Sequence, residues 1–104
     1  ATMVGGATLT KLLGTSAWYA PGAAGAFVVE SILHDQKKMI PCSVALEGEY
    51  GESDICCGVP VILGKNGVEK IVELPLNAEE KAKFAASAEA VRKTNAALKE
   101  VGAL

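Results

Sequence analysis

A glycine-containing turn between two apolar segments constrains the fold of this chain more than any other feature. Residues 65 to 67 read Lys-Asn-Gly, and Asn and Gly both tolerate the positive backbone φ angles that tight hairpin turns require. Apolar runs, 55 to 63 and 68 to 74, lie on either side of this turn, and a third strand-compatible segment, 39 to 46, lies upstream. The three segments predict an antiparallel meander, in which Pro60 indicates an edge or a bulge.

Two helices are predicted before the meander. The first covers residues 1 to 13, where three leucines share one face, although two glycines near its start would each cost about 1 kcal/mol relative to Ala. A break at Thr15 or Ser16 separates it from a second helix, which includes Pro21 in its first turns and runs to about Gln36. This second helix is apolar nearly all round, so we expect it to be buried on most sides.

A long helix is predicted to end the chain. Asn77 and Glu80 match the reciprocal capping arrangement, in which each side chain accepts a hydrogen bond from the other residue's backbone N–H. Charged residues of this helix, Arg92 among them, are expected to face solvent, and the core-facing stripe is expected to be Phe84, Ala88, Val91, Leu98 and Val101. Residues 1 to 104 thus predict one α+β domain made of two helices, an antiparallel meander and a long terminal helix.

Composition and charge exclude several classes of partner. The net charge of -2 gives no sign of the basic face that binds nucleic acid or an anionic membrane. No apolar run approaches the ~20 residues of a membrane span, and the first residues lack a secretory signal, so we expect a soluble, cytoplasmic protein. The mean hydropathy of +0.28 predicts apolar surface that meets a partner. The chain begins with neither Met nor a capping signal, which favours a fragment.

No arrangement of reactive side chains predicts catalysis or metal binding. His34, the one histidine, lies near the polar end of the second predicted helix, where we expect it to be exposed or to cap the helix and to complement the helix dipole. Ser16 has no partner in a catalytic triad, and the acids between residues 47 and 54 lack the spacing of a calcium loop. Three cysteines lack metal-ligand spacing and are expected to be buried free thiols: Cys42, Cys56 and Cys57.

Three segments resemble the NAD-dependent lactate and malate dehydrogenase family. They are residues 16 to 21 (SAWYAP), residues 49 to 51 (EYG) followed by Asp54, and residues 58 to 70 (GVPVILGKNGVEK). The similarity extends over the whole chain and implies the carboxy-terminal, substrate-side domain of such an enzyme. The family's dinucleotide-binding Rossmann domain and its proton-transfer histidine lie upstream of this region, and the chain contains no G-x-G-x-x-G of its own.

The resemblance implies roles for three residues. Ser16 and Ala17 would form one wall of the substrate pocket, and Pro21 would lie beside the nicotinamide end of NAD. True lactate dehydrogenases tend to have threonine in place of Ala17, so the alanine favours malate and oxaloacetate, substrates of the tricarboxylic acid cycle. His34 does not match the family's Gly-x-His-Gly motif and Arg92 matches none of its substrate-binding arginines. The chain alone is therefore expected to be inactive.

The resemblance also implies partners. They are the protein's own amino-terminal Rossmann domain and further copies of the chain, in a dimer or a tetramer. Two alternatives stay open. One is a stand-alone interaction or oligomerisation domain, and the other is a fragment of a lactate dehydrogenase.

Overall fold

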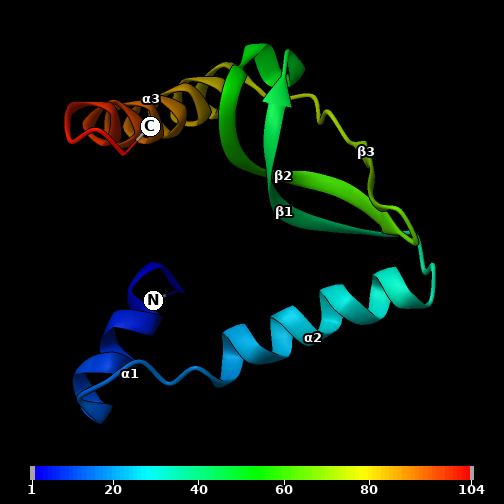
Figure 1. Ribbon diagram of the computed structural model, residues 1–104, viewed down its shortest axis with the longest axis vertical. Helices are drawn as coiled ribbons and strands as arrows, with labels where there is room; N and C mark the ends of the chain where they lie inside the picture. The colour runs from blue at the N-terminus through cyan, green and yellow to red at the C-terminus, as the bar shows by residue number, and fades with distance from the viewer. Residues whose placement is uncertain (1, 104) are drawn as a thin grey trace.

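The computed structural model describes residues 2–103, which form helices around a three-stranded sheet (Figure 1). In chain order the elements are η1 (Thr2–Val4), α1 (Gly5–Leu13), α2 (Tyr19–Leu33), β1 (Lys38–Glu47), η2 (Glu49–Gly51), β2 (Ser53–Gly64), β3 (Gly67–Ile71) and α3 (Ala78–Glu100). The η elements are short 3-10 turns. The predicted α+β class, with two helices, an antiparallel meander and a long terminal helix, is confirmed.

The sheet has the strand order β1-β2-β3, and both pairings are antiparallel. The second hairpin closes where Gly64 pairs with Gly67, so that its turn contains only Lys65 and Asn66. Gly67 adopts the positive φ, at 82°, which confirms the prediction of a tight turn.

The prediction that Pro60 indicates a strand edge is wrong, because β2 is the central strand. Pro60 lies opposite Pro41 of β1, and its carbonyl oxygen accepts a hydrogen bond of 2.9 Å from the Val72 N–H, beyond the end of β3. In an antiparallel sheet the N–H and C=O of one residue point toward the same neighbouring strand. The missing N–H of Pro60 therefore points to the β3 side, and no bond to β1 is lost. The alternative expectation, a bulge, is met nearby by a register shift between Ile62 and Leu63.

The hydrophobic core lies on one face of the sheet. Every second residue of β2 is buried there, and both α2 and α3 pack against this strand. The buried apolar residues are Leu46, Ile55, Cys57, Val59, Val61, Leu63 and Ala88. Of the three cysteines, all of which are free thiols, Cys57 is buried, Cys42 is half-buried and Cys56 is exposed. The prediction of buried thiols is thus confirmed for Cys57 and wrong for Cys56, whose side chain lies on the opposite face of β2.

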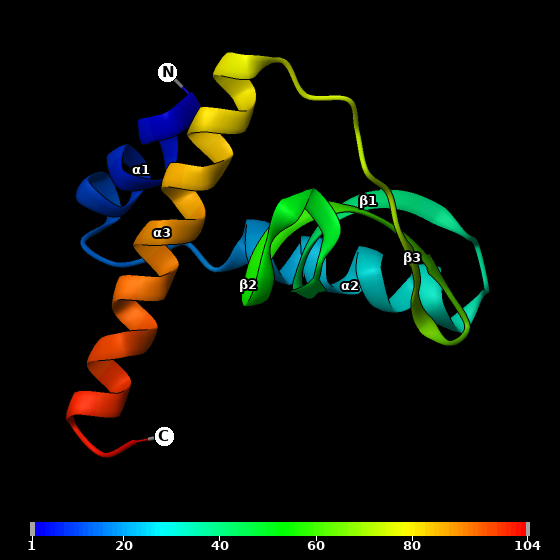
Figure 2. The ribbon, with the colours of Figure 1, turned by 90° about the horizontal axis from the view of Figure 1, so that it is seen from above.

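The terminal helix α3 begins with the predicted capping box. The Asn77 side chain accepts a hydrogen bond of 2.8 Å from the Glu80 N–H, and the Glu80 carboxylate accepts one of 2.9 Å from the Asn77 N–H. Ala88 is buried in the core, with Phe84 and Val91 packed beside it. The predicted stripe is wrong further on, because the second half of α3 projects beyond the strands (Figures 1 and 2). At the end of the stripe, Leu98 is 41% exposed and Val101 is 76% exposed.

The prediction that the second helix is buried on most sides is also wrong for this structure. Ser31 is the buried residue of α2, whereas its large apolar residues Phe27, Val29 and Leu33 are exposed. The radius of gyration is 16.3 Å, compared with about 13 Å for a compact domain of this length. The accessible surface is 7674 Å², compared with about 5,500 Å² expected from the mass. The reason is that, among the described elements, α2 makes its main contact with β2.

Within residues 2–103, no helix combines the length and the apolar character needed to cross a membrane.

Candidate functional site

The residues predicted to wall a substrate pocket lie in the connection between α1 and α2. The helix α1 ends at Gly14, which has a φ of 76° and donates its N–H to the Thr10 carbonyl at 2.9 Å. The chain turns again at Trp18, a bulky residue with a positive φ of 66°, a conformation that costs of order 1 kcal/mol. The Tyr19 N–H donates to the Ala17 carbonyl at 2.8 Å. The turn therefore holds Ala17 two residues before the first residue of α2, with Trp18 between them.

The three predicted residues differ in exposure. Ala17 is half-buried, whereas Ser16 and Pro21 are exposed. Pro21 is the third residue of α2, a position whose N–H has no partner within a helix, so the proline costs the helix no hydrogen bond. The pocket described below lies elsewhere, between the β1–β2 turn, the segment after β3 and α3. The roles of Ser16, Ala17 and Pro21 in binding substrate and cofactor therefore remain predictions.

His34 and Arg92 are placed in structural roles. His34 is the exposed C-cap of α2, as predicted, and its backbone N–H donates to the Glu30 carbonyl at 3.0 Å. Arg92 does not simply face solvent, because its guanidinium donates a hydrogen bond to the carboxylate of Glu52, which raises the pKa of Arg92. Neither side chain is arranged to exchange a proton with a substrate or to clamp its carboxylate.

Acidic side chains near the β1–β2 turn are used within the chain. The Glu49 carboxylate accepts a hydrogen bond of 2.7 Å from the Glu47 N–H, which lowers the pKa of Glu49. Among the described residues, no group of three His, Cys, Asp or Glu side chains is placed to hold a metal ion.

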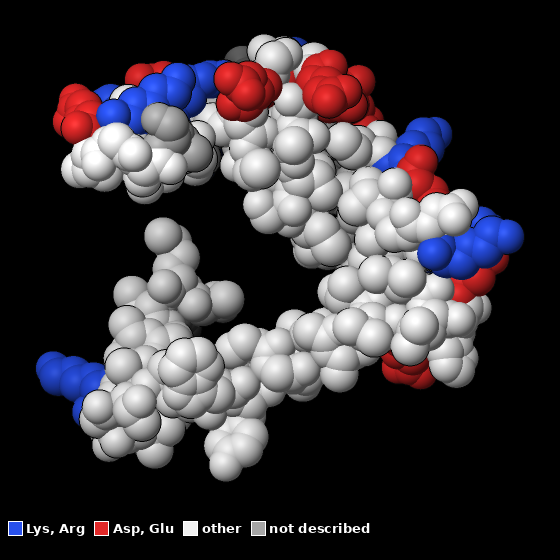
Figure 3. All heavy atoms as spheres, viewed as in Figure 1, with Lys and Arg blue, Asp and Glu red and all other residues white. Residues whose placement is uncertain are grey.

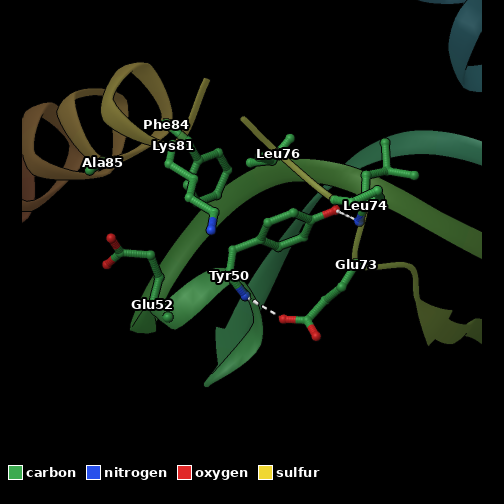
Figure 4. A pocket seen from close by; sticks show the side chains of 10 residues that line it. Tyr50, Glu52, Glu73, Leu74, Leu76, Lys81, Phe84 and Ala85 are labelled. Atoms are coloured by element: carbon green, nitrogen blue, oxygen red, sulfur yellow. Dashed lines mark hydrogen bonds between the residues drawn. The ribbon is translucent and has the colours of Figure 1, made fainter. Parts of the chain in front are cut away.

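Tyr50 is a key residue that the sequence reasoning missed. Its hydroxyl donates a hydrogen bond of 2.6 Å to the Val72 carbonyl and accepts one of 2.9 Å from the Leu74 N–H (Figure 4). Its backbone N–H donates to the Glu73 carboxylate at 2.6 Å, and its ring lies 5.2 Å from that of Phe84. Tyr50 therefore joins the β1–β2 turn to the segment that leads into α3. The signal was present in the glycines at positions 48 and 51, which allow the positive φ angles of this turn.

A pocket of about 790 Å³ adjoins Tyr50. Figure 4 shows Lys81 and Phe84 of α3 on one side of it and Leu74 and Leu76 on the other. Its two acids are engaged, Glu73 by the Tyr50 N–H and Glu52 by Arg92. The full lining is Tyr50, Gly51, Glu52, Glu73, Leu74, Pro75, Leu76, Lys81, Phe84 and Ala85. The pocket shows no arrangement of a nucleophile, base or metal ligand, and its hydrogen bonds stabilise the fold.

The first two helices, α1 and α2, and the residues next to them carry many large apolar side chains that are exposed. Figure 3 shows the charged side chains mainly on the outer surface, while the inner side of the molecule in this view is almost free of charge. The exposed large residues of this part are Met3, Val4, Leu9, Leu12, Leu13, Trp18, Tyr19, Phe27, Val29 and Leu33.

Comparison with known proteins identifies the fold. The family described as lactate/malate dehydrogenase, alpha/beta C-terminal domain, matches residues 2–101. The chain is 92% identical over all 104 of its residues to the malate dehydrogenase of Bacteroides thetaiotaomicron, and 88% identical over 103 residues to that of Bacteroides fragilis. It spans 33% of the length of each of these relatives.

Solved structures agree with this assignment. The malate dehydrogenase of Salinibacter ruber is 45% identical with a TM-score of 0.88, over 95% of this chain and 33% of that one. The lactate dehydrogenase of Eimeria maxima, solved with NADH and oxamate, is 38% identical with a TM-score of 0.91, over 96% of this chain and 32% of that one. The chain therefore belongs to the lactate/malate dehydrogenase family, through the alpha/beta C-terminal domain of that family.

Proposed function

We propose that this chain is the substrate-side domain of an NAD-dependent malate dehydrogenase, and that the whole protein interconverts malate and oxaloacetate. The observation that carries the proposal is the 92% identity, along the full length of the chain, to a protein named malate dehydrogenase. The small side chain of Ala17 supports the same choice of substrate, because it would leave room for the second carboxylate of oxaloacetate.

The cofactor must be held mostly outside this chain. NAD, when bound, supplies the hydride acceptor of the reaction. Its diphosphate is held in this family of folds by a glycine-rich turn, and the chain has no G-x-G-x-x-G. Ser16, in the α1–α2 connection, and Pro21, in the first turn of α2, are both exposed, so they would offer one wall and no enclosure. We assign the main cofactor site to an amino-terminal Rossmann domain of the same protein.

The proposal predicts activity for the whole protein and none for this part of it. The test is oxaloacetate-dependent oxidation of NADH, followed by NADH absorbance, with the full-length protein that contains this sequence and with residues 1–104 alone. Turnover by the full-length protein and none by the 104 residues is the expected result. A full-length protein that oxidises NADH with pyruvate and not with oxaloacetate would show that the parent is a lactate dehydrogenase.

That alternative has specific support, since the lactate dehydrogenase of Eimeria maxima is similar over 96% of the chain. Ala17 offers the sharpest test of substrate choice. In the full-length protein, Ala17→Thr is expected to lower kcat/KM for oxaloacetate by roughly 10 to 200-fold, the range for one misplaced methyl-sized group in a pocket, with a smaller effect on pyruvate. Ala45→Thr, on the exposed face of β1, is the matched control and should change neither value.

We further propose that the exposed apolar surface of α1 and α2 is covered by the amino-terminal domain and by a second copy in a cytoplasmic dimer or tetramer. The excess of about 2,000 Å² of accessible surface over a compact chain supports this, because it exceeds the roughly 800 Å² that each partner buries in a standard interface. Sedimentation discriminates between the alternatives. A well-defined oligomer of the 104 residues alone would favour the stand-alone oligomerisation domain, whereas aggregation would favour a domain that needs the rest of its protein.

A further inference from the structure

The helix α2 is attached to the rest of the chain near its C-terminal end. Ser31 is 0% exposed and donates its hydroxyl to the Phe27 carbonyl at 2.8 Å. Val28 packs against the core, and the ammonium of Lys38 lies 4.4 Å from the centre of the Phe27 ring. The first residue of the helix, Tyr19, is 87% exposed. In the described chain the helix, about 22 Å long, therefore meets the sheet near its C-terminal end, whereas Pro21 lies near its start and Ala17 two residues before that start.

An ion cluster of Asp35, Lys37 and Glu69 lies beside the C-terminal end of α2. The Lys37 ammonium lies 3.0 Å from the Glu69 carboxylate of β3 and 3.4 Å from that of Asp35. The Asp35 carboxylate also accepts a hydrogen bond of 2.9 Å from the Lys65 N–H, at the tip of the β2–β3 hairpin. The cluster thus links the turn after α2 to the hairpin tip at two points. Consistently, the Lys65 N–H lowers the pKa of Asp35, and the bond to Glu69 raises the pKa of Lys37.

The geometry of the cluster is tightly constrained. Gly64 is buried below it, and a Cβ added to Gly64 would lie 2.6 Å from an oxygen of Glu69 and 2.7 Å from an oxygen of Asp35. Asp35 and Lys37 both have positive φ angles, 48° and 50°, which non-glycine residues rarely adopt. Such conformations cost free energy and persist only where the surrounding structure holds them.

We propose that Asp35, Lys37 and Glu69 are positioning residues, which fix the direction of α2 against the sheet and thereby place Ala17 and Pro21. The inference about catalysis rests on the proposed function, whereas the inference about the helix does not. A rotation of α2 by about 5° about its C-terminal end displaces the start of the helix, about 22 Å away, by about 2 Å. Displacements near 1 Å can cost a hundredfold in rate, so a partly restrained shift is expected to lower kcat/KM about tenfold.

The test uses the full-length protein and three variants. Lys37→Met removes the bridging charge, and Lys37→Arg keeps it. Lys83→Met is the matched control, because it removes an exposed lysine whose ammonium lies 2.8 Å from Glu79 on α3, away from α2. The measurements are Tm, kcat and KM for oxaloacetate, and hydrogen exchange of the backbone over residues 15 to 25.

The proposal expects Lys37→Met to raise KM and lower kcat/KM about tenfold, with a Tm like that of Lys83→Met, and to speed exchange over residues 15 to 25. Lys37→Arg should restore both. If Lys37→Met matches Lys83→Met in kinetics and exchange, the cluster does not position α2 and the proposal is overturned. If the unmodified protein does not turn over oxaloacetate, the proposed function fails, and the exchange measurement alone still decides the role of the cluster.

Discussion

The hydroxyl of Tyr50 gives the most direct prediction about what holds this domain together. Tyr50→Phe removes one oxygen atom and keeps the ring that lies 5.2 Å from Phe84. It leaves two backbone groups without their partner, the carbonyl of Val72 at 2.6 Å and the N–H of Leu74 at 2.9 Å. Phenylalanine and tyrosine have the same backbone preferences, so the positive φ of this residue adds nothing to the difference.

The magnitude follows from the surroundings of the two bonds. The bond to Val72 is part-buried, so its loss costs about 1 to 1.5 kcal/mol, whereas the bond from Leu74 is exposed and water replaces much of it, which leaves about 0.5 to 1 kcal/mol. The sum is about 2 kcal/mol. At 1.36 kcal/mol per factor of ten, this corresponds to a roughly 30-fold larger opening equilibrium of the segment that contains Val72 and Leu74.

Native-state hydrogen exchange of the Leu74 amide in the full-length protein measures this equilibrium directly. Ser87→Ala is the control, because it removes an exposed hydroxyl on α3 and should change stability by less than about 0.5 kcal/mol. Equal exchange at Leu74 in the two variants would refute the argument that the Tyr50 hydroxyl joins the turn to the segment before α3.

Two further predictions concern the ends of α2 and α3. Asn77→Ala should destabilise the protein by about 1 kcal/mol in urea unfolding, because it removes the acceptor for the Glu80 N–H, while Asn77→Asp should be close to neutral. The ion cluster should depend on pH at both extremes. The lowered pKa of Asp35 gives stability that is present above its ordinary value of 3.8 and is lost as pH falls through the folded value. The raised pKa of Lys37 gives stability that is present below its ordinary value of 10.5 and is lost as pH rises through the folded value. The difference in unfolding free energy between the unmodified protein and Lys37→Met should therefore be flat from about pH 4 to pH 10 and shrink on both sides, and a difference that varies steadily across this range would contradict the assignment.

Local chemistry made the meander and the last helix predictable. The Gly67 turn and the Asn77 capping box depend on residues within a few positions of each other, and both form as expected. The role of Pro60 was not predictable in the same way. Whether a central strand tolerates a proline depends on which neighbouring strand the missing N–H faces, and the pairing of Pro60 with Pro41 and with the end of β3 decides this.

Contacts across long sequence separations were missed for a related reason. The Tyr50 hydroxyl meets partners 22 and 24 residues away, and Arg92 meets Glu52 40 residues away, distances at which no periodic pattern is informative. The apolar pattern of α2 correctly indicated a helix, but the pattern does not say which surface, if any, within the same segment of chain covers it. For the candidate site, the sequence indicated Ser16, Ala17 and Pro21, while the positive φ of Trp18 beside them became visible only in three dimensions.

The central position of β2 has a consequence for how the domain assembles. β1 and β3 are its neighbours along the chain as well as in space, so both hairpins can form early, from contacts that close only short loops. The helices α2 and α3 pack on the same strand, yet each reaches it from one side of the meander in sequence. A defect in β2 would therefore leave both helices with no surface to dock on, whereas a defect in either helix would leave the hairpins able to form. During synthesis, the exposed core face of a β2 that is still waiting for α3 would be the surface at greatest risk of aggregation.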